Sequence, residues 1–138
     1  MTHTHPIRVY YEDTDLAGIV YYANYLKFIE RGRSEWLRSL GLDQAAMKAG
    51  GGGVFAVRRV VADYLAPARF DDLLDVVTAL AGHSGARLVL HQDVRRAGDV
   101  LFAADVTLVC LTQTGRPQRL PSALLAKIGN NPPDKPQE

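Results

Sequence analysis

The feature of this sequence that most constrains its fold is a single long helical pattern followed by four strand-like runs. Apolar residues recur at three- and four-residue spacings over about residues 22–40, which is typical of an amphipathic helix. Runs with the composition of strands follow at 54–65, 73–81, 87–95 and 100–111. One helix cannot supply the crossovers that several parallel strands require, so a doubly wound parallel sheet is excluded. The pattern predicts an α+β fold in which the four runs meander antiparallel against the helix.

Turn-forming residues predict where these elements begin and end. Residues 7–12 alternate in polarity as a first strand would. Gly41 is placed to end the helix in a left-handed conformation, and the Gly98-Asp99 pair between two apolar runs predicts a hairpin. Gly32 weakens the helical pattern, since a glycine inside a helix costs about 1 kcal/mol relative to alanine.

Length and composition limit the number of domains and the class of protein. The chain has 138 residues, of which 47% are hydrophobic and 22% charged, as expected for one globular domain. We predict a flexible N-terminus at residues 1–6, a single domain over 7–129 and a disordered, proline-bearing tail at 130–138. The formal net charge of +1 gives no indication of a nucleic-acid partner.

Cysteine usage and hydropathy indicate the compartment. Cys110 is the only cysteine, which excludes an intrachain disulfide and a cysteine-based metal cage. No apolar stretch reaches the roughly 20 residues that a transmembrane helix needs. Residues 1–6 lack the apolar middle of a signal peptide. The sequence therefore predicts a cytoplasmic protein.

The segment with the most chemical information is residues 10–36, YYEDTDLAGIVYYANYLKFIERGRSEW. It places Asp13, Asp15 and Gly18 in a loop that leads into the predicted helix. A helix start offers unpaired N–H groups and the positive end of the helix dipole, which polarise a carbonyl placed against them. A carboxylate before that turn can attack the carbonyl or activate a water molecule, and Gly18 allows close approach. Asp15 is the predicted carboxylate, whereas Asp13 is expected to brace the loop through hydrogen bonds.

This segment resembles the signature of the hydroxybenzoyl-CoA thioesterase family. It is most similar to the branch associated with the Tol-Pal operon, whose members are short-chain or lipid-related acyl-CoA thioesterases. The resemblance continues through VRRVVADYLAPARFDDLLDV at residues 57–76, and through the late segments LVCL and RLPSAL. It therefore covers nearly the whole predicted domain.

The resemblance implies a hotdog fold, in which a five-stranded antiparallel sheet wraps a long central helix, assembled into homodimers or homotetramers. It implies an enzyme that hydrolyses an acyl-CoA to a free acid and coenzyme A, with an acyl carrier protein as a second candidate donor. Asp15 aligns with the catalytic aspartate, which acts as nucleophile or general base. The backbone amide of Tyr22 aligns with the donor that polarises the thioester carbonyl, and Gly18 with a loop glycine. No metal, cofactor or prosthetic group is implied.

Substrate-binding residues follow from the same resemblance and from side-chain chemistry. Tyr21 and Tyr25 are expected to lie near the acyl pocket. Arginine suits the phosphates of coenzyme A because its donors form a rigid fork, and the first candidates are Arg87 and Arg119. Relatives in the Tol-Pal branch usually carry His where this chain has Tyr22, so the resemblance leaves the acyl preference open.

Other interpretations remain open at this point. Asp15 could simply cap the following turn, or join Glu12 and Asp13 in a cation site, although no further ligand follows at suitable spacing. A hotdog hydratase or dehydratase shares the fold and substrate class, but it normally needs a His beside its acid, and the domain offers only His83 and His91. A non-catalytic acyl-carrier or envelope-complex partner would keep the fold without the chemistry.

Overall fold

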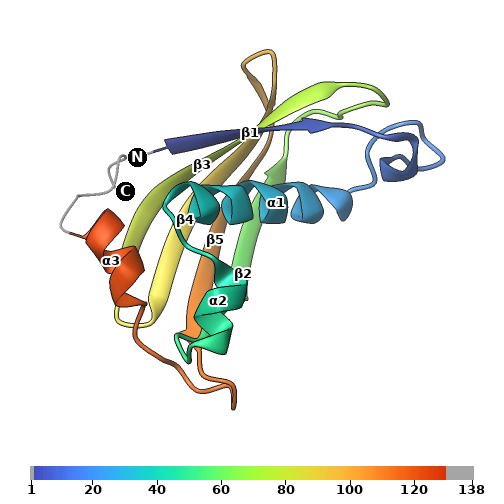
Figure 1. Ribbon diagram of the computed structural model, residues 1–138. Helices are drawn as coiled ribbons and strands as arrows, with labels where there is room; N and C mark the ends of the chain where they lie inside the picture. The colour runs from blue at the N-terminus through green and yellow to red at the C-terminus, as the bar shows by residue number, and fades with distance from the viewer. Residues whose placement is uncertain (1, 130–138) are drawn as a thin grey trace.

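The computed structural model describes residues 2–129, and these form one curved sheet crossed by a long helix (Figure 1). The strands are β1 (Thr2–Arg8), β2 (Val54–Tyr64), β3 (Leu73–Ser84), β4 (Arg87–Arg96) and β5 (Asp99–Leu111). The helices are α1 (Asn24–Ser39), α2 (Gln44–Ala49) and α3 (Ser122–Ile128), with a 3-10 turn η1 (Tyr11–Asp13). No helix in the described part of the chain has both the length and the hydropathy to cross a bilayer.

The order of the strands in the sheet is β1-β3-β4-β5-β2, and every neighbouring pair is antiparallel. Strands β3, β4 and β5 meander as predicted, but β2 pairs with β5 at the edge opposite β1. The prediction of a simple four-strand meander is therefore wrong for β2. Alternation of polarity shows that a strand has a face to bury, but it does not identify the neighbour that supplies its hydrogen bonds. The connection at residues 65–72 consequently passes the end of the sheet beside the start of α1, where Ala68 and Tyr25 meet.

The first strand begins earlier than predicted. Strand β1 pairs with β3 from Thr2 opposite Ala79 to Arg8 opposite Leu73, so residues 2–6 are part of the sheet and not a flexible lead-in. Residues 11 and 12, predicted as the end of this strand, form η1 together with Asp13 instead. Histidines and threonines mask the alternation in β1, which is an edge strand and buries little of its surface. The predicted disorder at 130–138 lies outside the described residues.

The end of α1 and the β4–β5 turn agree with their sequence signals. Gly41 has φ of 84°, and the N–H of Leu42 donates to the carbonyl of Leu37 at 3.1 Å, as in a Schellman cap. The hairpin between β4 and β5 is confirmed, with Ala97 (φ 52°) and Gly98 (φ 89°) as its turn residues, one position earlier than predicted.

A small residue and a buried amide hold α1 close to the sheet. A Cβ atom added at Gly32 would lie 2.3 Å from Cγ1 of Val76 on β3, so only glycine allows this approach. Gln92 of β4 is fully buried. Its side-chain amide donates to the carbonyl of Ile29 and to the hydroxyl of Thr78, both at 2.9 Å. The helix is thus positioned by the close fit of Gly32 against Val76 and by the buried hydrogen bond from Gln92 to the helix backbone.

Candidate active site

The loop before α1 is braced by Asp13. Its carboxylate accepts a hydrogen bond from the N–H of Tyr10 at 2.8 Å. Its backbone carbonyl accepts from the N–H of Tyr21 at 2.9 Å and from the side-chain amide of Asn24 at 3.1 Å. The side chain is 8% exposed, so these bonds are sheltered from water. The expectation that Asp13 braces the loop is confirmed, and the bracing ties both arms of the loop to the first residue of α1.

Asp15 begins a tight turn at the exposed tip of this loop. The N–H of Asp15 donates to the carbonyl of Ile19, and the N–H of Gly18 donates to the carbonyl of Asp15, both at 2.9 Å. Gly18 has φ of 80°, which a residue with a side chain rarely adopts. One carboxylate oxygen of Asp15 accepts from the N–H of Ala17 at 2.9 Å, and within residues 2–129 its side chain makes no other hydrogen bond or ion pair. Asp15 is therefore an oriented, exposed carboxylate with one oxygen available to a substrate.

The start of α1 leaves backbone donors available. The helix begins at Asn24 with Ala23 as its N-cap, so the predicted start at Tyr22 is two residues too early. The N–H of Asn24 donates to the carbonyl of Tyr21 at 2.8 Å. Among the described residues, the N–H groups of Tyr22 and Ala23 have no hydrogen-bond partner. Unpaired N–H groups at a helix start are the donors that stabilise negative charge on a substrate oxygen.

A mainly apolar pocket of about 330 Å³ lies beside these amides. Ile19 and Val20 line it from the Asp15 turn, Tyr22 and Tyr25 from the start of α1, and residues 64–67 from the end of β2. Asp15 is not part of this lining, although the turn it begins continues directly into Ile19. The predicted substrate residue Tyr25 thus lines the pocket, whereas Tyr21 does not. Tyr21 is half-exposed and contacts the edge of the Tyr22 ring.

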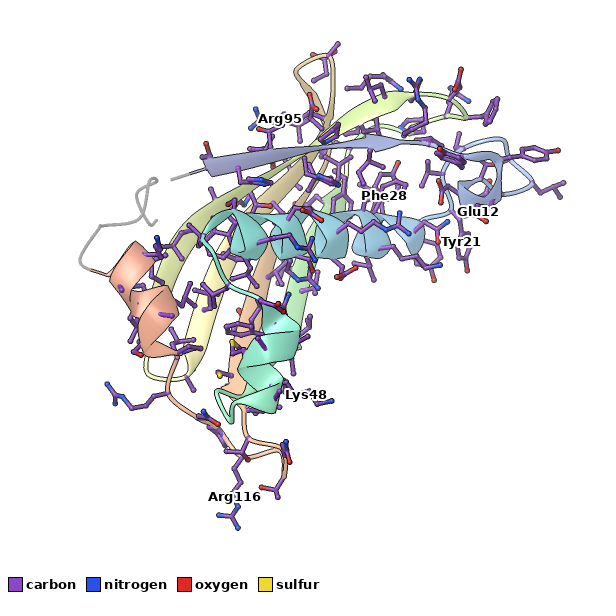
Figure 2. The ribbon with its side chains drawn as sticks, in the orientation of Figure 1. Glu12, Tyr21, Phe28, Lys48, Arg95 and Arg116 are labelled. Carbon is purple, nitrogen blue, oxygen red and sulfur yellow. The ribbon has the colours of Figure 1, made fainter. Side chains whose placement is uncertain are left out.

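The pocket floor is an aromatic cluster. The Tyr25 ring stacks on Phe102 with 5.0 Å between centroids, and its hydroxyl accepts from the N–H of Ala68 at 3.1 Å. Burial raises the pKa of Tyr25, and the hydrogen bond from Ala68 only partly offsets this. Phe28 follows on the buried side of the helix and is fully covered (Figure 2). Tyr25 therefore acts as a fixed wall of the pocket.

The predicted phosphate ligands lie at the other end of the sheet. Asp15 is near the start of β3, because Ile19 bridges to Arg69 just before that strand. Arg87 lies opposite Ser84 at the far end of β3, and Leu120, next to Arg119, donates to the carbonyl of Gly85. The length of β3 separates the two regions by roughly 35 Å. In Figure 2, Glu12 and Tyr21 lie at one end of the molecule and Arg116 lies at the other. One chain does not bring Arg87 or Arg119 to Asp15.

The two histidines predicted within the domain, His83 and His91, also lie away from Asp15. His83 pairs with Leu88 near the far end of β3. The ring of His91 is bonded on both nitrogens, to Asp105 at 2.8 Å and Asp93 at 2.9 Å. The histidine that a hotdog dehydratase normally places beside its acid is therefore not supplied by either residue. In residues 2–129, no three His, Cys, Asp or Glu side chains are arranged to hold a metal ion.

An ion pair holds the connection that forms one wall of the pocket. The carboxylate of Asp72 accepts from the Arg96 guanidinium at 2.7 Å and from the N–H of Arg69 at 2.8 Å. The same guanidinium donates to the carbonyl of Pro67 at 3.3 Å. Burial by itself would raise the pKa of Asp72, but the hydrogen bonds from Arg69 and Arg96 outweigh it and lower the pKa below its ordinary value.

An Asp72→Asn variant is expected to be less stable by about 1 kcal/mol at pH 7. Because the folded-state pKa is lowered, Asp72 contributes stability above its unfolded pKa of about 3.9, and this is lost as the pH falls through the folded-state value. Urea unfolding at pH 7 and pH 3 measures the effect, which should be smaller at pH 3 than at pH 7. Asp99→Asn is the matched control, because Asp99 is exposed and its side chain makes no hydrogen bond or ion pair within residues 2–129. An equal loss at both pH values would contradict the assignment.

Sequence reasoning missed three contributors to this site. The N–H of Ala23, the hydroxyl of Tyr64 and the side chain of Gln92 were not among the predicted residues. Gln92 carries a detectable signal, because it is a polar residue on the apolar face of a strand between Leu90 and Val94. The other two have no such signal, since their roles depend on contacts between distant segments.

Comparison with known proteins shows relatives in sequence and in fold. Residues 9–128 match the Thioesterase-like superfamily. The acyl-CoA thioester hydrolase YbgC of Escherichia coli O6:H1 is 40% identical over 125 residues, covering 89% of this chain and 92% of that protein. A probable thioesterase from Bartonella henselae has 37% identity and a TM-score of 0.85, covering 88% of this chain and all (100%) of its own.

A third relative has a more specific name. The 1,4-dihydroxy-2-naphthoyl-CoA thioesterase Slr0204 from Synechocystis has 26% identity and a TM-score of 0.86, covering 99% of this chain and 100% of its own. These matches confirm the predicted hotdog fold and the resemblance to thioesterases. The chain therefore belongs to the thioesterase-like superfamily.

Proposed function

We propose that this protein hydrolyses the thioester of an acyl-CoA to a carboxylic acid and coenzyme A, with Asp15 as the reacting carboxylate. The observation that carries the proposal is that the loop leading into α1 presents an exposed, oriented Asp15 carboxylate, while the first N–H groups at the start of α1 are unpaired among the described residues. The apolar pocket beside these amides would receive the acyl group. Relatives with 40% identity over most of the chain are named acyl-CoA thioester hydrolases, which supports this reaction.

In the proposed mechanism, the amide of Tyr22 or Ala23 binds the thioester oxygen and stabilises the negative charge that develops on it. The Asp15 carboxylate either attacks the carbonyl carbon or removes a proton from a water molecule that attacks. In the first route the thiolate leaves and a mixed anhydride remains, which water hydrolyses to regenerate Asp15. In the second route the tetrahedral intermediate expels the thiolate directly. A thiol has a pKa of about 8.5, so it leaves without a strong acid, and neither route needs a metal or cofactor.

The first test of this function is a survey of substrates with the wild-type protein. Short, long and aromatic acyl-CoAs are offered, and the free thiol of coenzyme A is measured as it appears. We expect hydrolysis of at least one class, with the acyl group bound in the mainly apolar pocket beside the start of α1. An acyl carrier protein as donor and an enoyl-CoA, for hydration, complete the survey. Hydration without thiol release would favour a dehydratase, and no turnover of any substrate would contradict an enzymatic role.

Assembly into a dimer or a larger oligomer is part of the proposal. Within residues 2–129, strand β2 is an edge of the sheet, and its Val57, Val60 and Val61 are 47%, 37% and 48% exposed. An apolar edge strand of this length favours pairing with a second copy. Arg87 or Arg119 could reach the substrate of Asp15 only in such an assembly. Sedimentation should give at least twice the chain mass, and a Val60→Lys variant should dissociate while staying folded.

The cytoplasmic location also remains a prediction. Acyl-CoA substrates are consistent with it, and fractionation of cells that express the protein tests it. Recovery of the protein with the membrane fraction or outside the cell would contradict it.

A further inference from the structure

We propose that Tyr64 is a positioning residue, whose hydroxyl holds the backbone at the start of α1 so that the N–H groups of Tyr22 and Ala23 stay free for the substrate oxygen. This inference rests on the proposed function and concerns the same site. Tyr64 is the last residue of β2, and its hydroxyl donates to the backbone carbonyl of Tyr22 at 3.0 Å. The contact joins an edge strand to a segment 42 residues earlier in the chain.

The carbonyl of Tyr22 is available to Tyr64 because the first turn of α1 is tight. The N–H of Leu26 donates to the carbonyl of Ala23 at 3.2 Å, three residues back. In a regular α-helix this N–H would instead bond to residue 22, four residues back. The Tyr64 hydroxyl therefore occupies the acceptor that would otherwise extend the helix by one residue.

The same contact fixes the peptide groups that carry the free donors. The carbonyl of Tyr22 and the N–H of Ala23 belong to one planar peptide unit, so holding the first orients the second. The preceding peptide unit, which carries the N–H of Tyr22, is held through the bond from Asn24 to the carbonyl of Tyr21. Without the Tyr64 hydroxyl, the carbonyl of Tyr22 could join the helical hydrogen bonds and α1 could begin earlier. The N–H groups of Tyr22 and Ala23 would then point in a different direction.

The position of the Tyr64 ring does not depend on its hydroxyl. The ring packs edge-to-face against Phe102 at 5.0 Å and against Tyr25 at 5.5 Å between centroids. Phe102 is fully buried, so the ring is anchored to the core. Desolvation, with smaller contributions from Tyr22 and Tyr25, raises the pKa of Tyr64, which keeps its hydroxyl a proton donor. A Tyr64→Phe variant should therefore remove the hydrogen bond and little else.

The first experiment compares kcat and KM for acyl-CoA hydrolysis in wild type and Tyr64→Phe. One net hydrogen bond corresponds to a roughly 2- to 10-fold fall in kcat, with KM unchanged because the pocket wall is kept. Tyr11→Phe is the matched control, because Tyr11 is highly exposed and its hydroxyl makes no hydrogen bond within residues 2–129. Its kcat should equal that of wild type.

A spectroscopic measurement separates positioning from general destabilisation. In an Asp15→Asn background, acyl-CoA stays bound, and the thioester carbonyl stretch reports its polarisation by the amides. Adding Tyr64→Phe should shift this stretch back toward its value in solution. An unchanged stretch and an unchanged kcat in Tyr64→Phe would overturn the inference about Tyr64 alone. Wild-type turnover in Asp15→Asn would instead overturn the proposed function.

Discussion

An Asp15→Asn variant is expected to bind acyl-CoA as wild type does and to lose about 10²- to 10⁴-fold in kcat. Asparagine has the shape of aspartate and keeps the side-chain oxygen that accepts from the N–H of Ala17. The turn that contains Gly18 should therefore form as before. A neutral amide is a poor nucleophile and a very weak base, so both proposed routes are blocked. Release of free thiol measures kcat, and calorimetry with an intact acyl-CoA measures binding.

The same loop provides a control for the Asp15 variant. Glu12 is an exposed acid three positions earlier, and its side chain makes no hydrogen bond or ion pair in the described chain. Glu12→Gln removes the same charge from the loop and should leave kcat within about twofold of wild type. Equal losses in the two variants would mean that the loop acts through its overall charge. Undiminished turnover in Asp15→Asn would remove this carboxylate from the mechanism.

A Gly32→Ala variant is expected to unfold more easily, by about 1–3 kcal/mol, although alanine is the better helix former. The added methyl group would lie 2.3 Å from Cγ1 and 3.0 Å from Cβ of Val76. Val76 is fully buried and cannot move aside without disturbing the core. The helix must then lift from the sheet, which also strains the bond between Gln92 and the carbonyl of Ile29. Urea denaturation measures the loss of stability.

A double-mutant cycle tests whether contact with Val76 is the cause. Val76→Ala alone should destabilise the protein, because it leaves a cavity. In Gly32→Ala/Val76→Ala the two methyl changes compensate, so the double variant should be more stable than the sum of the single effects predicts. Lys27→Ala is the control, because it shows how an alanine on the exposed side of the same helix changes the stability. Additive losses in the cycle would show that another contact limits the approach of the helix.

The helix, the strands β3 to β5 and the residues of the Asp15 turn were predictable because their signals are local. Helical and strand periodicity reflect which residues face the core within one segment. Asp13, Asp15 and Gly18 lie within a stretch of six residues, so one loop brings them together whatever the rest of the chain does. The cap at Gly41 depends on the helix that it ends, and it was predictable for the same reason.

Contacts between distant segments were not predictable in this way. The place of β2 beside β5, the hydrogen bond from Tyr64 to Tyr22 and the approach of Gly32 to Val76 each join residues at least 38 positions apart. Gly32 looked like a weakness in the helix, yet it is what allows the helix to pack closely. The chemistry of arginine favours Arg87 and Arg119 as phosphate ligands, but the length of β3 separates them from Asp15.

By itself, the sequence determined that a helix start would lie next to a carboxylate and a glycine, and that one helix would pack on an antiparallel sheet. Both follow from short-range spacing, which the backbone geometry of helices, strands and turns converts directly into structure. Only the tertiary structure decided which amides stay unpaired, which residues wall the pocket and which strand remains an open edge. These three features depend on which segments far apart in the sequence pack against each other, and the packing of the whole core determines this.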